Sequence, residues 1–246
     1  MKISVITITY NSAKTLPRAL ASVQGQTFAD IEHIIVDGAS TDGTLEMIQA
    51  YADKHKNVKW ISEKDSGIYN ALNKGIRMAS GDVIGFLHSD DVLFAPDSIE
   101  HIATIFNSQD ADVVYGDLQY CHANRVVRRW QSNPFKPSSL KFGWMPPHPT
   151  VYVRRKVYEE VGPYDEWFRI SADYDMILRI FSAGYNAYYI PEVIVSMETG
   201  GASNRNTKAR LSKTQEDYIA LKKNHVGAGY LTVAFKQLRK IRQFLR

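Results

Sequence analysis

The sequence predicts an α/β protein built on a doubly wound, mostly parallel sheet, with a small antiparallel portion and helices at the C-terminal end. Three observations lead to this prediction. In residues 1–90, short apolar runs alternate with segments of helical periodicity, in repeated units of about 20–30 residues that are typical of β-α-β structure. After residue 110, closely spaced strand-like runs favour antiparallel pairing. Residues 207–246 contain helical patterns alone.

The composition is that of one ordinary globular domain. The chain has 246 residues, of which 44% are hydrophobic and 23% charged, a balance that argues against disorder. No apolar run approaches the ~18 residues of a membrane span, and residues 2–6 already resemble a strand, without a signal-peptide region. The single cysteine, Cys121, has no internal partner. These features lead us to expect a cytoplasmic protein.

The first half predicts four strands with helices between them. A helix carrying Leu16, Leu20 and Val23 follows a Ser12 cap, and residues 68–78 form a helix with Ile68, Leu72 and Ile76 on one face. A further helix carries Leu45, Ile48 and Tyr51. The strands are residues 3–9, 31–36, 58–61 and 83–87. Right-handed crossovers would place the ends of all four strands on one rim of the sheet.

That rim would collect Tyr10, Asp37, Asp65 and the pair Asp90 and Asp91. Each acid taken singly could cap a helix or lie in a solvated turn. An aspartate at a strand end can also accept hydrogen bonds from a ribose hydroxyl or a base N–H, the use we assign to Asp37 and Asp65.

Paired carboxylates after a buried strand suit a divalent cation that carries a phosphate ligand. The strand ends contain neither GxGxxG nor a P-loop. A metal would therefore have to neutralise the phosphate charge.

The second half predicts shorter elements and one more acidic helix. We expect a helix that opens at residues 172–175, with Met176, Ile177, Ile180 and Phe181 inward and with Asp173 and Asp175 in its first turn, where acids also complement the helix dipole. Residues 99–106 and 156–161 predict helices, residues 118–121 and 126–130 a hairpin, and residues 112–115, 150–153, 187–190 and 193–197 further strands. Loops at residues 134–149 and 198–205 are of the length that is often functional.

The C-terminal segment is strongly basic. Residues 207–246 contain ten Lys or Arg against Glu216 and Asp217. After a break at residues 227–229, the last helix would align its apolar residues on one side and its basic residues on the other, with Leu231, Phe235, Leu238, Ile241 and Leu245 forming the apolar stripe. Such a helix either packs on its own domain or contacts an anionic membrane through residues 230–246.

Five motifs in order resemble the inverting glycosyltransferases of family 2, which have the GT-A fold. They are residues 4–11 (SVITITYN), 36–44 (VDGASTDGT), 63–76 (EKDSGIYNALNKGI), 89–91 (SDD, a variant of the DxD motif) and 172–175 (ADYD). The match runs from Ser4 to about Arg205. It implies a GT-A domain at residues 1–206, with a nucleotide-sugar half at 1–116 and an acceptor half at 117–206, and a basic helical extension at 207–246.

The resemblance implies a role for each matched residue. Asp37 and Asp65 would hold the nucleobase and ribose, with Thr9 and Tyr10 beside the base. Asp90 would face the ribose or the sugar, Asp91 would bind Mg²⁺ or Mn²⁺ at the diphosphate, and Asp173 would be the catalytic base. Two positions depart from the family pattern, because Ala172 replaces a glutamate and Leu72 an arginine.

Two further residues carry open alternatives. His148, within a proline-rich loop, is expected to line the acceptor side or approach the diphosphate, and a structural histidine is the alternative. Arg205 could close over the phosphates as part of a lid, or be a plain surface arginine.

The sequence therefore predicts a metal-dependent inverting glycosyltransferase. It would use a nucleoside diphosphate sugar, most simply UDP-linked, and a saccharide acceptor, lipid-linked in surface polysaccharide synthesis at the inner face of the plasma membrane. We expect no nucleic-acid partner. A nucleotidyltransferase is one alternative, although residues 10–13 lack the basic glycine-rich loop for a triphosphate. The other is a non-catalytic nucleotide-sugar-binding subunit, which slow donor hydrolysis would exclude.

Overall fold

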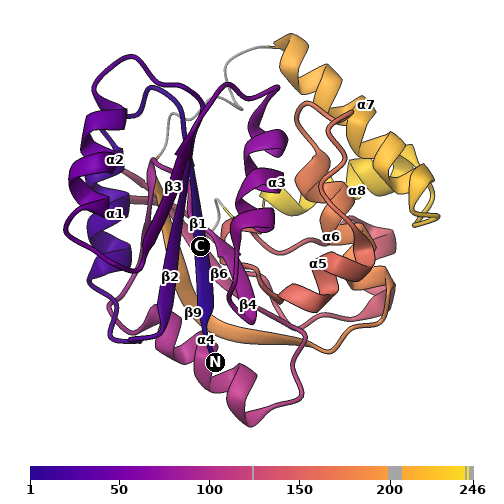
Figure 1. Cartoon of the computed structure of the whole chain (residues 1–246). Coiled ribbons are helices and arrows are strands. Elements are labelled where there is room, and N and C mark those ends of the chain that lie inside the picture. Colours follow the sequence, from indigo (N-terminus) through magenta and orange to yellow (C-terminus); the bar gives the residue numbers. More distant parts are fainter. Residues whose placement is uncertain (124, 199–206, 242, 244–246) are drawn as a thin grey trace.

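The computed structural model describes residues 1–123, 125–198, 207–241 and 243, and in this part of the chain one mixed sheet lies between layers of helices (Figure 1). The strand order is β3-β2-β1-β4-β8-β6-β9-β5, with β7 paired to β6. The strands are β1 (Ile3–Thr9), β2 (Ile31–Asp37), β3 (Val58–Ser62), β4 (Val83–Phe86), β5 (Asp91–Leu93), β6 (Val113–His122), β7 (Arg125–Trp130), β8 (Tyr152–Arg154) and β9 (Ala187–Glu198). The helices are α1 (Leu16–Gln24), α2 (Thr44–Ala52), α3 (Ile68–Met78), α4 (Ser98–Ser108), α5 (Arg155–Val161), α6 (Ala172–Ser182), α7 (Thr207–Lys223) and α8 (Tyr230–Ile241), with 3₁₀ turns η1 (Pro137–Phe142) and η2 (His148–Thr150).

The N-terminal part of the sheet is parallel, as the repeated β-α units predicted. Strands β3, β2, β1 and β4 pair side by side in the same direction. Helices α1 and α2 cover one face of these strands and α3 covers the other (Figure 1). Because both faces are covered, β1 and β2 are buried along their whole length. All four predicted strands and the helix at residues 68–78 are confirmed.

Two details of this half were wrong. Ser12 does not cap α1, which begins at Leu16 after Thr15, with a proline in its first turn. Ile68 is 47% exposed, so the buried face of α3 is centred on Leu72 and Gly75 instead. A Cβ on Gly75 would lie 2.4 Å from the side chain of Ile6, which shows how closely this helix packs on β1.

The C-terminal part of the sheet is mixed. Strand β8 pairs antiparallel with both β4 and β6, while β6 and β9 run parallel. The predicted hairpin is the pair β6 and β7. The predicted break at Pro191 is wrong, because β9 continues through it, and the register with β6 shifts between Tyr115 and Asp117. Such an irregularity tolerates a residue that has no N–H to donate.

The C-terminal helices pack on the domain. Ala220, Leu221 and Val233 belong to the same buried cluster as the side chains of α3 and α6. The predicted apolar stripe of α8 does not form this contact, because Leu231 and Leu238 are 56% and 57% exposed. Among the described residues, no helix is both long and apolar enough to cross a membrane. The division of the chain at residue 206 remains a prediction.

Candidate functional site

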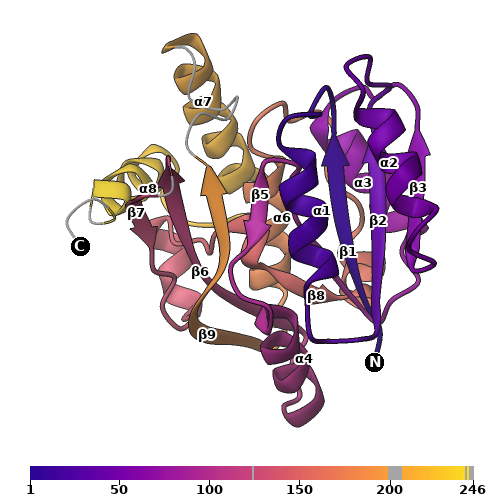
Figure 2. The same ribbon diagram turned by 90° about the vertical axis from the view of Figure 1, so that its left-hand side faces the viewer.

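The ends of the first parallel strands meet at one edge of the sheet. Strands β1 and β3 point to the same end of the molecule (Figure 2), and Thr9 at the end of β1 lies opposite Asp37 at the end of β2. The next residue, Gly38, lies between two predicted site residues. A Cβ there would be 3.1 Å from Asp65 Oδ2 and 3.3 Å from Tyr10 Cδ2. The glycine therefore lets Tyr10, Asp37 and Asp65 come together.

Asp37 and Asp65 are both held by internal contacts. Asp37 is fully buried and accepts hydrogen bonds from Ser40 N (3.0 Å), Ser40 Oγ (2.5 Å) and Ser62 Oγ (2.6 Å). Asp65 forms an ion pair with Lys74, at 2.5 Å between Oδ1 and Nζ. Tyr10 is 66% exposed beside them. Any ligand at this edge would meet an exposed aromatic ring and a fixed carboxylate–lysine pair.

The turn after β4 contains the acidic pair. Asp91 N donates to His88 O at 3.0 Å, and Ser89 Oγ donates to Ser12 Oγ in the loop after β1. Asp91 begins β5 and is fully buried, and neither carboxylate oxygen has a hydrogen-bond partner among the described residues. Burial, with the charge of Asp90, raises the pKa of Asp91 well above its usual range. Asp91 is therefore a buried carboxyl group without a hydrogen-bond partner in the described part of the chain.

Asp173 lies close enough to this turn for its charge to act on the histidines there. Burial lowers the pKa of His88, while the carboxylates of Asp90 and Asp173 act in the opposite direction. Burial also raises the pKa of Tyr69, and Asp173 adds to the increase. Asp90 and Asp173, 83 positions apart in the chain, thus share the neighbourhood of one imidazole. The charges of both predicted residues therefore act on the same side chain.

His148 belongs to the same cluster. Its ring stacks on Phe86 with 5.3 Å between centroids and lies 6.3 Å from the ring of His88. Its Nε2 is 2.6 Å from the hydroxyl of Tyr164. Burial lowers the pKa of His148 to about 4, with Asp173 opposing and His88 reinforcing the shift. His148 is thus neutral at pH 7, and it is both a packed side chain and a neighbour of Asp173.

The N-terminus of α6, which carries Asp173, is capped by another helix. Ser171 precedes α6 without making a side-chain cap. The carboxylate of Glu216, on α7, instead accepts hydrogen bonds from the backbone N–H groups of Arg169 (3.2 Å), Ile170 (2.8 Å) and Ser171 (2.9 Å). Glu216 thus fixes the segment that leads into α6 and ends at the N-cap, Ser171, and its charge complements the helix dipole.

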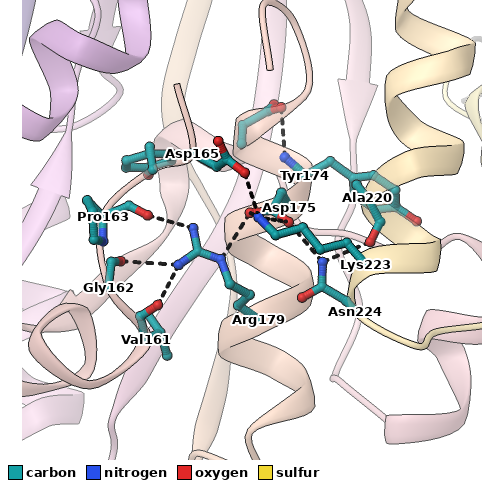
Figure 3. Close-up of polar contacts among 12 residues, drawn as sticks. Val161, Gly162, Pro163, Asp165, Tyr174, Asp175, Arg179, Ala220, Lys223 and Asn224 are labelled. Carbon is teal, nitrogen blue, oxygen red and sulfur yellow. Dashed lines mark hydrogen bonds and ion pairs between the residues drawn. The ribbon is translucent and has the colours of Figure 1, made fainter. Parts of the chain in front are cut away.

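A second carboxylate fixes α6 one turn later (Figure 3). Asp175 is fully buried and receives hydrogen bonds from Arg179 Nε (3.0 Å), Lys223 Nζ (3.3 Å) and Asn224 Nδ2 (2.9 Å). Arg179 also donates to the carbonyls of Val161, Gly162 and Pro163, and Lys223 pairs with Asp165 at 2.8 Å. Asp175 therefore has a structural role, and the tail supplies two of its partners.

A third contact connects α6 to α8. Lys236 is 4% exposed, its Nζ lies 2.9 Å from Asp217 Oδ2, and it sits 3.2 Å from the centre of the Tyr174 ring. Burial lowers the pKa of Lys236 to about 7, although Asp217 opposes this shift. Burial disfavours the charged form of Asp217, but Lys236 and Lys213 hold its pKa below the usual value. The ion pair therefore lies against α6 at Tyr174, the residue after Asp173.

Comparison with known proteins identifies the family. The model of the glycosyl transferase family 2 matches residues 4–170. A PGL/p-HBAD biosynthesis glycosyltransferase from Mycobacterium tuberculosis is 34% identical over 205 residues, which cover 82% of this chain and 78% of that protein. The chain belongs to glycosyl transferase family 2. An uncharacterized glycosyltransferase from Nostoc is 33% identical over 229 residues, 88% of this chain and 70% of its own length.

Solved structures confirm the GT-A-type fold of this glycosyltransferase. Residues 1–349 of TarS from S. aureus, in complex with UDP, give a TM-score of 0.72 at 20% identity, covering 100% of this chain and 71% of that one. The mannosyltransferase PcManGT from Pyrobaculum calidifontis, in complex with GDP-Man and Mn²⁺, gives 0.70 at 19% identity, covering 99% and 72%. The predicted family, enzyme class and fold are therefore confirmed, and the nucleotidyltransferase alternative is not supported.

The acidic turn of this glycosyltransferase fits a divalent cation. The oxygens of Asp91 are orphaned and its pKa is raised, and a bound cation would reverse both effects by favouring the ionised carboxylate. The described residues contain no cluster of three ligating side chains. Mg²⁺ and similar ions commonly take one or two carboxylates and complete their shell with substrate phosphates and water.

Several functional candidates were missed by the sequence analysis, and Arg205 lies outside the described residues. His88 directly follows the β4 segment and precedes the acidic pair, so its position next to a candidate metal motif was a usable signal. Glu216 and Asp217 are the two acids of the basic tail, and their isolation there was another signal. Tyr164 gave no such signal, because its contact with His148 is a tertiary one.

Proposed function

We propose that this chain transfers a glycosyl group from a nucleoside diphosphate sugar, most simply UDP-linked, to a hydroxyl group of a saccharide acceptor, with inversion at the anomeric carbon. The observation that carries the proposal is the match to glycosyl transferase family 2 over residues 4–170. In this structure the charges of Asp90 and Asp173 both act on His88. One acid follows the strand that ends among the donor-side residues, and the other begins a helix of the second half. A donor and an acceptor could thus meet between them.

In the proposed reaction, Asp173 accepts the proton of the acceptor hydroxyl while the hydroxyl oxygen forms a bond to the anomeric carbon. The bond from that carbon to the diphosphate oxygen breaks, and its electron pair leaves with the nucleoside diphosphate. A divalent cation held by Asp91 would stabilise this negative charge. Tyr10, Asp37 and Asp65 would hold the nucleoside end, and Asp90 the ribose or sugar. A positioned base of this kind typically contributes ~10²–10⁴ in rate.

The named relatives support the choice of donor. TarS has been crystallised with UDP and with UDP-GlcNAc, and PcManGT with GDP-Man and Mn²⁺. They share the fold of this chain and bind nucleoside diphosphates linked to sugars. The proposed acceptor is a lipid-linked saccharide in surface polysaccharide synthesis, in keeping with the basic, apolar surface of α8 described below.

The Asp173→Asn variant tests the base. The amide keeps the size of the side chain but cannot take the proton, so we expect donor affinity within about twofold of the wild type and turnover reduced by about 10²–10⁴. Calorimetry with UDP-sugars and Mn²⁺, together with a donor-turnover assay, measures both quantities. Asp165→Asn, the same carboxylate-to-amide change at a partly exposed position before α6, is the matched control and should retain turnover.

Two results would count against this proposal. Full turnover in Asp173→Asn would remove Asp173 as the base. Binding of nucleotide sugars by the wild type, without any transfer or slow hydrolysis to free sugar, would instead favour the non-catalytic donor-binding subunit.

A further inference from the structure

Two stretches of the chain that contain no acidic residue meet on one surface. Residues 118–158 contain eight Lys or Arg and no Asp or Glu, and residues 218–246 contain seven and none. The first stretch contacts the second through η1, where Thr232 Oγ1 donates to the carbonyl of Lys141 at 2.9 Å. Strand β7 and α8 lie side by side (Figure 2), and Arg128 Nε donates to Gln243 at 2.8 Å. Arg154 and Lys156 of the first stretch bind Ala111, Phe106 and Asp112 elsewhere in the molecule. The exposed cations of this surface are those of β7, η1 with the residue before it, and α8, namely Arg125, Arg129, Lys136, Lys141 and Arg239.

The same surface exposes large apolar side chains. Leu231 and Leu238 are 56% and 57% exposed, and they lie on one side of α8 with Phe235 between them. The ring of Phe235 contacts that of Phe142, which is 52% exposed, with 5.6 Å between centroids. We call these four residues the α8 face. Their exposure is not needed for folding, because α8 is already anchored on its other side by Val233 and Lys236.

We propose that the α8 face docks on the surface of an anionic lipid bilayer. An apolar helix stripe bordered by basic residues is the combination that lies in a membrane interface, with its apolar side among the acyl chains and its cations at the headgroups. Lys141 is exposed next to Phe142, and Arg239 is exposed one residue after Leu238. A nucleic acid would bind through the basic side chains, which contact its phosphates, and would leave the exposed leucines without a role.

Docking on this face would place the catalytic helix next to the membrane. Helix α8 contacts α6 through Lys236 and the ring of Tyr174, the residue that follows Asp173. A lipid-linked acceptor held in the bilayer would then reach the site without leaving the membrane surface. The inference about docking does not depend on the proposed reaction, because it concerns a different surface and is measured without substrate.

Vesicle co-sedimentation of the full chain tests the inference. We expect binding to vesicles of phosphatidylcholine and phosphatidylglycerol in a 7:3 ratio, little binding to pure phosphatidylcholine, and weakening as salt is raised. The Leu238→Glu and Phe142→Glu variants should each lower the partition coefficient at least fivefold. The control is Phe94→Glu, since Phe94 is 51% exposed but lies between β5 and α4, outside the α8 face.

The outcomes separate the proposal from its rivals. Equal binding of Leu238→Glu and Phe94→Glu, equal binding to neutral and anionic vesicles, or no binding by the folded wild type would each overturn it. A dimer in sedimentation velocity that Leu238→Glu dissociates, without vesicle binding, would assign the face to a second copy instead. Circular dichroism of each variant verifies that it is folded.

Discussion

The two halves of the molecule hold their buried carboxylates in different ways. In the N-terminal half, which we propose binds the donor, Glu32 is 5% exposed and is bound by Ser4, Ser80 and Lys59, all within neighbouring β-α units. In the other half, Asp175 is bound by Arg179 one turn away and by Lys223 and Asn224 at the end of α7. The proposed donor half is therefore stabilised by local units, whereas helix α6 depends on the tail.

The largest effect is expected at Asp175. The Asp175→Ala change would leave the charges of Arg179 and Lys223 without their buried partner, and loss of one member of a buried pair typically costs ~3–5 kcal/mol. Chemical denaturation monitored by circular dichroism measures the free energy of unfolding. The control, Asp165→Ala, removes the more exposed partner of Lys223 and should cost about 1 kcal/mol or less. Similar losses in both variants would show that the network is not anchored at Asp175.

A smaller effect, on turnover, is expected at Glu216. The Glu216→Ala change removes the cap that orients α6, and small displacements of a catalytic group can cost up to ~10²-fold in rate. We expect kcat to fall about 10-fold to 100-fold, with donor KM unchanged, because the donor half has its own contacts. Glu216→Gln keeps an acceptor oxygen and should recover part of kcat. Steady-state kinetics with both substrates varied measures kcat and the donor KM separately.

A donor KM that rises as much as kcat falls would contradict the comparison, because it would connect the tail to the donor side. Unchanged kinetics in a folded Glu216→Ala variant would show that α6 does not need this cap.

Sequence patterns predicted the donor half well because its contacts are local. The ends of β1, β2 and β4 follow fully buried runs, whereas β3 is partly exposed, and the repeat of β-α units is sufficient to bring Asp37, Asp65 and Asp90 to one rim. They failed where a contact spans the chain: β5 forms only because β9 lies beside it. Leu231 and Leu238 look like core residues by periodicity, yet Lys236 takes the buried position through Asp217 and Tyr174. Periodicity cannot identify a helix whose buried side is partly ionic.

The smallest effect is a dependence of stability on pH that we expect from Lys236 in the C-terminal tail. Burial lowers the pKa of Lys236 from 10.5 to about 7, so between these values the unfolded chain binds a proton that the folded protein lacks, and the free energy of unfolding rises with pH. From pH 7 to 9 we expect the wild type to gain about 1–2 kcal/mol relative to Lys236→Met.

Denaturation midpoints at both pH values measure this difference, with the exposed Lys222→Met as the control that keeps the wild-type slope. Glu32, in the N-terminal half, should contribute no slope in this range. It has a pKa of about 2 in spite of the opposing effect of burial, because Lys59, Ser80 and Ser4 stabilise the charged form. The contribution of Glu32 is therefore complete above its ordinary value of 4.5 and is lost only as the pH falls toward 2. Parallel slopes for Lys236→Met and the wild type would mean that Lys236 keeps its proton in the folded protein, as a fully compensated ion pair with Asp217.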